Sequence, residues 1–126
     1  MTATRAASWP VGWAIHEATS RRARGRGLLG RRALSAREGL WLPVRSIHTI
    51  GMRFALDLVW LGGDGRVVRV DEHVLPGRLR TCLRARGGVV EIAAGSGAPL
   101  TLALRAGPAA YFSSGSRSSE RERVAR

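Results

Sequence analysis

The sequence predicts a mainly β protein, namely a small single-domain β-sandwich or jelly-roll-like barrel with one short helix. Three observations support this fold class. Several short segments alternate apolar and polar residues with the period of two that is typical of a half-buried strand. Segments rich in glycine and proline separate these strands. The length of 126 residues fits one domain.

The clearest predicted element is a β-hairpin. Residues 53–61 place apolar side chains at alternate positions, as a strand with one buried face does. The run Gly62-Gly63-Asp64-Gly65 follows, and Gly63 and Gly65 favour a turn because glycine adopts positive φ freely. A return strand over residues 66–70 is rich in valine.

The remaining pattern predicts further strands and one helix. Four more strands are expected over residues 11–16, 40–44, 88–94 and 100–105. Pro43 indicates that its strand lies at a sheet edge or carries a bulge, because proline cannot donate a ladder hydrogen bond. Thr19 or Ser20 is placed to cap a short helix that begins near Arg21.

Loops and terminal segments complete the expected organisation. We expect residues 45–51 and 71–82 to be irregular. Residues 1–10 are predicted as a flexible N-terminus and residues 11–112 as the β-sandwich domain. Residues 113–126 are predicted as a disordered polar tail, since serine, glycine and mixed charges bury too little apolar surface.

Composition restricts the class of protein. No apolar stretch reaches the roughly 20 residues that a membrane-spanning helix needs. The first residues lack the apolar core of a signal peptide, so we expect a cytoplasmic protein. The one cysteine, Cys82, excludes an internal disulfide.

The chain is strongly basic, with a formal net charge of +12, and all 21 basic residues are arginine. Such a charge attracts nucleic acid, anionic membrane or acidic partners. The densest run covers residues 21–37 and contains no aromatic side chain on which a base would stack. This favours a solvated basic segment, with non-specific electrostatic binding of nucleic acid as the alternative.

Residues 24–95 resemble the uncharacterised bacterial and archaeal family called domain of unknown function 192. Five segments carry the resemblance in the order of the family's motifs: RGLLGR from Arg26, GLWL from Gly39, SIHTIGMRF from Ser46, LDLVWL from Leu56, followed by DGRV, and VEIAAG from Val90. The resemblance implies a compact jelly-roll β-sandwich with a short helix. The family has no established activity, so the resemblance implies no catalytic roles.

The candidate site is centred on Asp57, which stands mid-strand between two leucines although aspartate is disfavoured in strands. A buried carboxylate needs hydrogen bonds or a cation, so Asp57 either accepts backbone N–H groups from the preceding loop or faces a cleft. His48, Thr49 and Arg53 precede it, and together with Asp57 and Arg78 they form the predicted ligand-binding set.

Four residues are predicted to be structural rather than functional: Gly63 and Gly65 of the hairpin turn, Glu91 and Arg31. Glu91 alternates with apolar neighbours and is expected to meet an arginine on an adjacent strand. Arg31, in the first family-like segment, belongs to the same structural group.

The sequence predicts no metal site and no other cofactor. The three histidines, His16, His48 and His73, lack the close spacing that zinc sites usually show. We therefore expect a non-enzymatic binding or accessory domain for a small polar or anionic ligand or a protein partner. The alternative is an enzyme in which His48 and Asp57 act as an acid–base pair; no catalytic residue is otherwise assigned.

Overall fold

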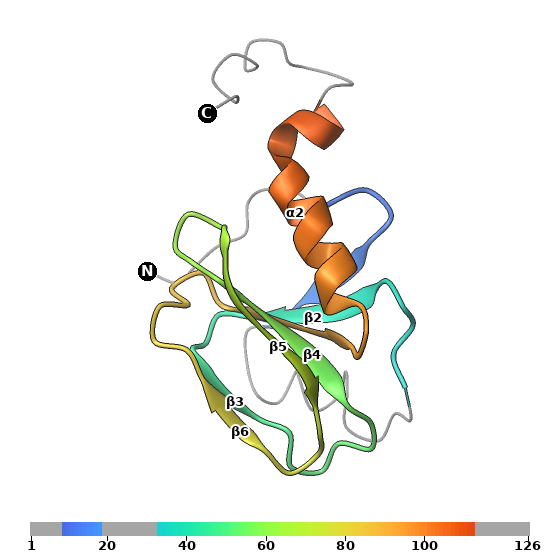
Figure 1. Ribbon diagram of the computed structural model, residues 1–126, viewed down its shortest axis with the longest axis vertical. Helices are drawn as coiled ribbons and strands as arrows, with labels where there is room; N and C mark the ends of the chain where they lie inside the picture. The colour runs from blue at the N-terminus through green and yellow to red at the C-terminus, as the bar shows by residue number, and fades with distance from the viewer. Residues whose placement is uncertain (1–8, 19–32, 113–126) are drawn as a thin grey trace.

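The computed structural model describes residues 9–18 and 33–112, and this part of the chain contains seven strands and one helix (Figure 1). The elements are, in order, β1 (Ala14–Glu17), β2 (Glu38–Leu42), β3 (Ser46–His48), β4 (Leu56–Leu61), β5 (Val67–Val74), β6 (Leu79–Thr81), β7 (Val89–Ala93) and α2 (Gly97–Phe112). The predicted mainly β class is confirmed.

Five strands form one sheet in the order β1-β2-β7-β4-β5, and β3 and β6 form a separate antiparallel pair. In the larger sheet β1 pairs with β2 in parallel, and the other neighbours are antiparallel. Because β1 and β5 are its edges, this sheet is open and does not close into a barrel. The sandwich alternative in the predicted fold class is therefore the one observed.

Alternation along the central strands directs apolar side chains to both faces of the larger sheet. One core lies between the two sheets and combines Leu58 and Trp60 of β4 with Ile47 of β3. The other lies on the opposite face and combines Val59 of β4 with Leu100 of α2. All three β4 residues have 0% exposure. The central strands are thus buried on both faces, which explains their nearly continuous hydrophobic sequence.

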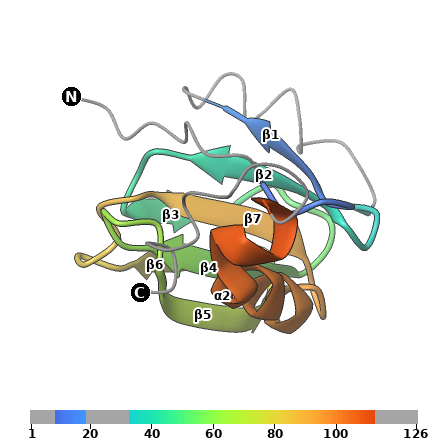
Figure 2. The ribbon, with the colours of Figure 1, turned by 90° about the horizontal axis from the view of Figure 1, so that it is seen from above.

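The C-terminal element α2 corrects the strand predicted over residues 100–105. Alternating Leu100, Leu102 and Leu104 resemble a strand, but of these three leucines only Leu100 is buried, and Leu102 is 68% exposed. Leu100 and Leu104 are four residues apart, and both pack in the core beneath the helix. Figure 2 shows α2 lying across the sheet, where it packs on β4 and β5.

Two segments predicted as irregular contain strands. Residues 45–51 include β3, and residues 71–82 include the end of β5 and all of β6. Pairing between the two segments forms this small sheet, with Ile47 opposite Arg80. Neither segment shows a long apolar alternation, so the partner strand rather than local propensity determines the structure.

The segment around Pro43 also differs from the prediction. Strand β2 ends at Leu42, so Pro43 lies just beyond it and interrupts no ladder. The strand is internal, between β1 and β7, and is not at an edge.

The hairpin of β4 and β5 is confirmed. Gly63 and Gly65 lie in its turn, which is closed by a hydrogen bond from Gly62 N–H to Arg66 O of 2.7 Å. Pairing of the two strands is irregular between Leu56 and Leu58 and again between Trp60 and Leu61. These bulges fall near the two ends of β5, an edge strand.

Several predictions fall outside the described residues. They are the helix near Arg21, most of the basic run at residues 21–37, the structural role of Arg31, and the tail at residues 113–126. Among the described residues, no helix is both long and apolar enough to cross a membrane.

Two glycines with positive φ allow a matched test of the packing between β2 and β7. Gly88 has a φ of 90°, and a Cβ there would lie 2.3 Å from Leu42 O, whereas Gly77 has a φ of 82° and open space around it. We expect Gly88→Ala to lower the free energy of unfolding by about 1–3 kcal/mol more than Gly77→Ala, because only Gly88→Ala adds a steric clash. Urea unfolding measures both, and equal losses would contradict this packing.

Candidate functional site

The Asp57 carboxylate is a buried acceptor for three backbone amides. The residue is 2% exposed. Its Oδ1 accepts the N–H of His73 at 2.8 Å, and its Oδ2 accepts those of Gly95 at 2.9 Å and Gly97 at 2.8 Å. Gly97 is the first residue of α2, so the carboxylate also lies at the positive end of the helix dipole. These bonds supply the partners that a buried charge requires.

The segments that Asp57 joins are not the loop that the sequence suggested. It fixes the bulge at His73, which has a φ of 54°, and the turn between β7 and α2. Asp57 lies on the α2 face of β4, two residues before Val59 of the core beneath the helix. His48 lies in the small sheet on the opposite side of β4. The structure therefore does not bring His48 and Asp57 together.

His48 belongs to the outer face of the small sheet. Its neighbour Ile47 is buried in the core between the sheets, so alternation directs His48 away from that core. Its partner across the strand pair is Leu79. The imidazole Nδ1 accepts a hydrogen bond from the Ile50 N–H at 3.2 Å, which orients the ring against the following turn.

Thr49 joins two turns at one end of the molecule. Its hydroxyl donates to Leu75 O at 2.7 Å and accepts the N–H of Arg78 at 2.8 Å. Its backbone N–H donates to Arg78 O, and its carbonyl accepts the N–H groups of Met52 and Gly77. Thr49 is 0% exposed. One side chain thus fixes the two turns against each other.

We call residues 49–53 and 75–79 the tip. It forms the lower end of the molecule in Figure 1, away from the C-terminal end of α2. Ile50 is 63% exposed, Leu79 67% and Leu75 43%. Arg53 and Arg78 are exposed as well. Of the predicted ligand-binding set, the structure therefore places Thr49, Arg53 and Arg78 in the tip, with His48 beside it.

We call residues 44–55 and 75–86 the ribbon layer; it comprises β3, β6 and their flanking turns. This layer contains no aspartate and no glutamate. It contains six arginines: Arg45, Arg53, Arg78, Arg80, Arg84 and Arg86. The surface that it presents therefore has a single sign of charge.

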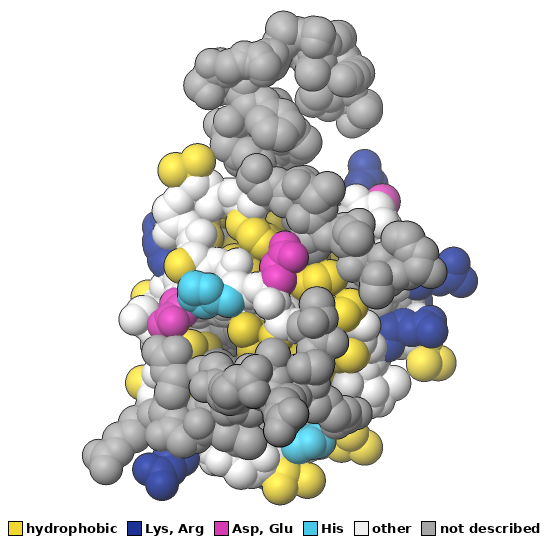
Figure 3. Space-filling model, turned by 180° about the vertical axis from the view of Figure 1, so that it is seen from behind, with side chains coloured by type: hydrophobic (Ala, Val, Ile, Leu, Met, Phe, Trp, Pro, Cys, Tyr) yellow, Lys and Arg dark blue, Asp and Glu magenta, His cyan; other side chains and the backbone are white. Residues whose placement is uncertain are grey.

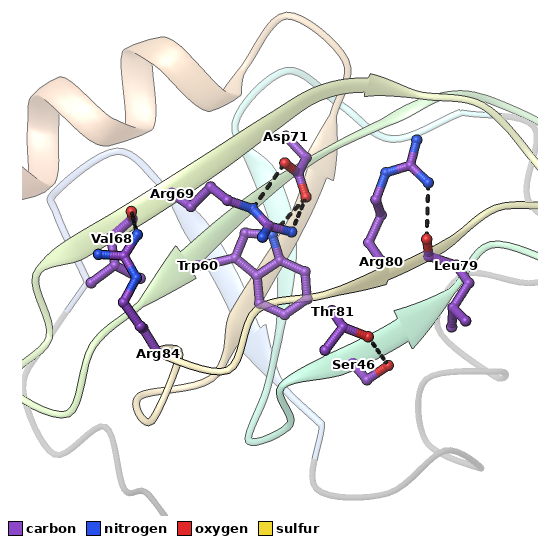
Figure 4. A network of polar contacts seen from close by, with 9 residues as sticks. All are labelled: Ser46, Trp60, Val68, Arg69, Asp71, Leu79, Arg80, Thr81 and Arg84. Atoms are coloured by element: carbon purple, nitrogen blue, oxygen red, sulfur yellow. Dashed lines mark hydrogen bonds and ion pairs between the residues drawn. The ribbon is translucent and has the colours of Figure 1, made fainter.

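On the larger sheet, by contrast, an arginine is paired with an acidic side chain. The sequence analysis did not identify this cluster. Asp71 accepts two hydrogen bonds from Arg69, at 3.1 and 2.8 Å, and one from Trp60 Nε1 at 3.0 Å (Figure 4). The Arg69 guanidinium also lies over the Trp60 ring, 5.3 Å from its centroid. The hydrogen bond to Asp71 raises the pKa of Arg69 above its ordinary value, against the lowering by desolvation. Arg69 and Asp71 are two residues apart and share one face of β5. This spacing indicates the cluster only when the pairing of β5 with β4, which brings Trp60 beside them, is known.

Glu91 is fully buried in β7, between Leu40 of β2 and Leu58 of β4 in the strand register. It faces the core between the sheets, where a carboxylate needs a polar or charged partner. The expected arginine partner stays a prediction. Within the described part of the chain, no group of three histidine, cysteine, aspartate or glutamate side chains is arranged to hold a metal ion.

Replacing Asp57 tests its role as an acceptor. We expect Asp57→Ala to lower the free energy of unfolding by about 3 kcal/mol, because it leaves three amides without an acceptor. Asp57→Asn keeps one acceptor oxygen and should cost less. The control is Asp64→Ala, since Asp64 is 67% exposed and accepts the Arg66 N–H. If urea unfolding shows that Asp57→Ala costs no more than the control, the assigned role is wrong.

The Thr49 hydroxyl is tested by the similarly shaped Thr49→Val. We expect a loss of about 1–3 kcal/mol in the free energy of unfolding, because the Arg78 N–H and the Leu75 carbonyl lose a partner. Hydrogen exchange at the Arg78 amide should quicken. Thr81→Val is the matched control, since it removes only an exposed 2.8 Å bond to Ser46. A Thr49→Val variant as stable as the control would contradict this role.

Two solved structures are similar to this chain in fold. One, from Novosphingobium aromaticivorans DSM 12444, is a protein of unknown function with 21% identity and a TM-score of 0.61; the match covers 70% of this chain and 68% of the other. The second, from Sinorhizobium meliloti 1021, is a protein for which a role as a transcription regulator has been suggested, with 20% identity and a TM-score of 0.58, over 68% and 72% of the two chains. At this identity the likeness shows the fold alone.

None of the curated proteins compared with the chain matches it. The model of the family DUF192, described as "Uncharacterized ACR", matches residues 4–107. This match spans most of the chain, including every strand described above. The chain therefore belongs to the domain of unknown function 192 family.

Proposed function

We propose that this protein is a non-enzymatic accessory domain that binds an anionic partner on its ribbon layer. The observation that carries the proposal is the contrast between six arginines and the lack of any carboxylate in that layer. Arginine presents five N–H donors in a planar fork that matches carboxylate and phosphate groups. A surface of this kind attracts anions and repels other cations.

The arginines of the ribbon layer differ from those of the larger sheet in how they are paired. Arg66 and Arg69 lie within 4.0 Å of Asp64 and Asp71, respectively. Within residues 9–18 and 33–112, none of the six ribbon-layer arginines forms an ion pair. Four of them donate to backbone carbonyls: Arg45 to Leu83, Arg78 to Pro76, Arg80 to Leu79 and Arg84 to Val68. Such bonds orient a guanidinium without neutralising its charge.

The distribution of the arginines favours an extended anionic partner over a single small ion. Arg53 and Arg78 lie at the tip, and Arg45 and Arg84 lie beyond the other end of the strand pair. The three paired residues between them span roughly 10 Å. An extended partner with several negative groups can contact both ends at once, so such a partner is favoured over a small ligand.

Binding of a partner is better supported than an enzymatic function in which His48 and Asp57 act as an acid–base pair. General acid–base catalysis needs both groups within reach of one substrate. The Asp57 carboxylate instead accepts three amides at 2.8–2.9 Å beneath α2, while His48 belongs to the ribbon layer. Binding on the ribbon layer requires no chemical role of Asp57 beyond stabilising the fold.

Charge removal at matched positions tests the proposal. We expect Arg53→Ser/Arg78→Ser to weaken binding to poly-L-glutamate about fivefold at low ionic strength, because two exposed pairs are lost. Arg66→Ser/Arg105→Ser removes the same charge elsewhere and should change the affinity less than about twofold. Isothermal titration calorimetry gives the dissociation constants, and added salt should weaken binding. A DNA duplex as a second titrant tests whether phosphate replaces carboxylate.

Three results would overturn the proposal. Equal losses in both double variants would show that net charge alone matters. A loss confined to a variant with Arg21, Arg22, Arg24 and Arg26 replaced by serine would move binding to the basic run. Absence of binding to both polymers at low ionic strength would remove the proposed function itself.

A further inference from the structure

We infer that the tip inserts aliphatic side chains into the headgroup region of an anionic membrane while its arginines bind lipid phosphates. This inference rests on the proposed function and names the anionic partner as a lipid surface. It combines two observations that the basic layer alone does not explain: the exposure of Ile50 and Leu79, and their place in the same two turns as Arg53 and Arg78.

Three of the six exposed large hydrophobic side chains among the described residues lie at this one end of the molecule. Ile50 and Leu79 are 63% and 67% exposed, and Leu75 is 43% exposed. The Thr49 hydroxyl bonds to Leu75 and Arg78, so it ties the turn that carries Ile50 to the turn that carries Leu79 before any partner binds. Figure 3 shows hydrophobic side chains protruding at this lower end of the molecule. Together they offer an apolar contact that exists before any partner arrives.

The charges around these side chains suit an anionic lipid surface. Arg53 and Arg78 are exposed in the same two turns, and the ribbon layer holds no carboxylate that would repel lipid phosphates. Arginine carries its charge on a long apolar stem, so the stem can lie beside inserted aliphatic groups while the guanidinium stays with the headgroups. Anionic lipids attract basic residues near the membrane surface.

A membrane fits this end of the molecule better than a protein does. The exposed large hydrophobic side chains of the described residues are all aliphatic, whereas protein-binding hot spots are enriched in tryptophan and tyrosine. Two adjacent turns at an extremity also offer a small area compared with the roughly 800 Å² that each partner buries in a standard protein interface. A second copy of this chain docked on this face would bring a second positively charged ribbon layer, and the two layers would repel each other.

Vesicle binding tests the inference with a matched pair of variants. Ile50→Ser/Leu79→Ser removes the apolar contact and keeps every charge. Val11→Ser/Leu102→Ser removes two side chains that are 81% and 68% exposed elsewhere. We expect the tip variant to lower the partition coefficient on phosphatidylcholine–phosphatidylglycerol vesicles about tenfold and the control variant less than about twofold. Vesicles of phosphatidylcholine alone should bind the wild-type chain far more weakly.

A second measurement reports insertion directly. Ile50→Cys and Val11→Cys are each labelled with an environment-sensitive fluorophore; Cys82 is only 3% exposed and should stay unlabelled. On anionic vesicles the label at position 50 should brighten and shift to shorter wavelength, and the label at position 11 should not change.

The outcomes separate this inference from the proposed function. If Ile50→Ser/Leu79→Ser binds anionic vesicles as the wild type does, or the label at position 50 stays in water, insertion is wrong. If the wild-type chain binds poly-L-glutamate but no vesicles, the proposed function stands and an acidic protein replaces the membrane. If neither is bound, both proposals fall.

Discussion

The carboxylate of Asp57 is the interaction on which the arrangement of the larger sheet and its helix depends. It joins three segments that are distant in sequence: β4, the bulge of β5 and the start of α2. Each amide that it accepts would otherwise be a donor at a bulge, in a turn or at a helix N-terminus, where no regular ladder supplies a partner. A single acidic side chain in the most buried strand therefore defines where the sheet ends and the helix begins.

The larger sheet and the ribbon layer differ in how their charged side chains are paired. On the larger sheet, acidic groups meet donors: Asp57 meets amides, and Asp71 meets Arg69 and Trp60. These contacts stabilise the fold. The ribbon layer contributes Ile47 and Met52 to the shared core, but none of its arginines forms an ion pair with a described carboxylate.

Much of the fold was predictable from the sequence, because β4 and its hairpin have strong local signals. Asp57 was identified as a buried acid that needs partners, although the partners themselves were not. They come from β5 and from the turn before α2, and only the folded chain brings these together. Strands β3 and β6 escaped prediction because each is three residues long and gains its structure from the other. The error at α2 arose because leucines two residues apart fit a strand and leucines four apart fit a helix, and the sequence contains both spacings.

The bulges of β5 have a consequence for the behaviour of the chain in concentrated solution. An eight-residue strand at the border of an open sheet offers unpaired amides and carbonyls to any neighbouring molecule. Here the pairing with β4 is interrupted near both ends of the strand, and charged side chains of Arg69, Asp71 and Glu72 lie along it. Irregular twist and charge both discourage the docking of a foreign strand, so this border is protected against the edge-to-edge stacking that begins aggregation.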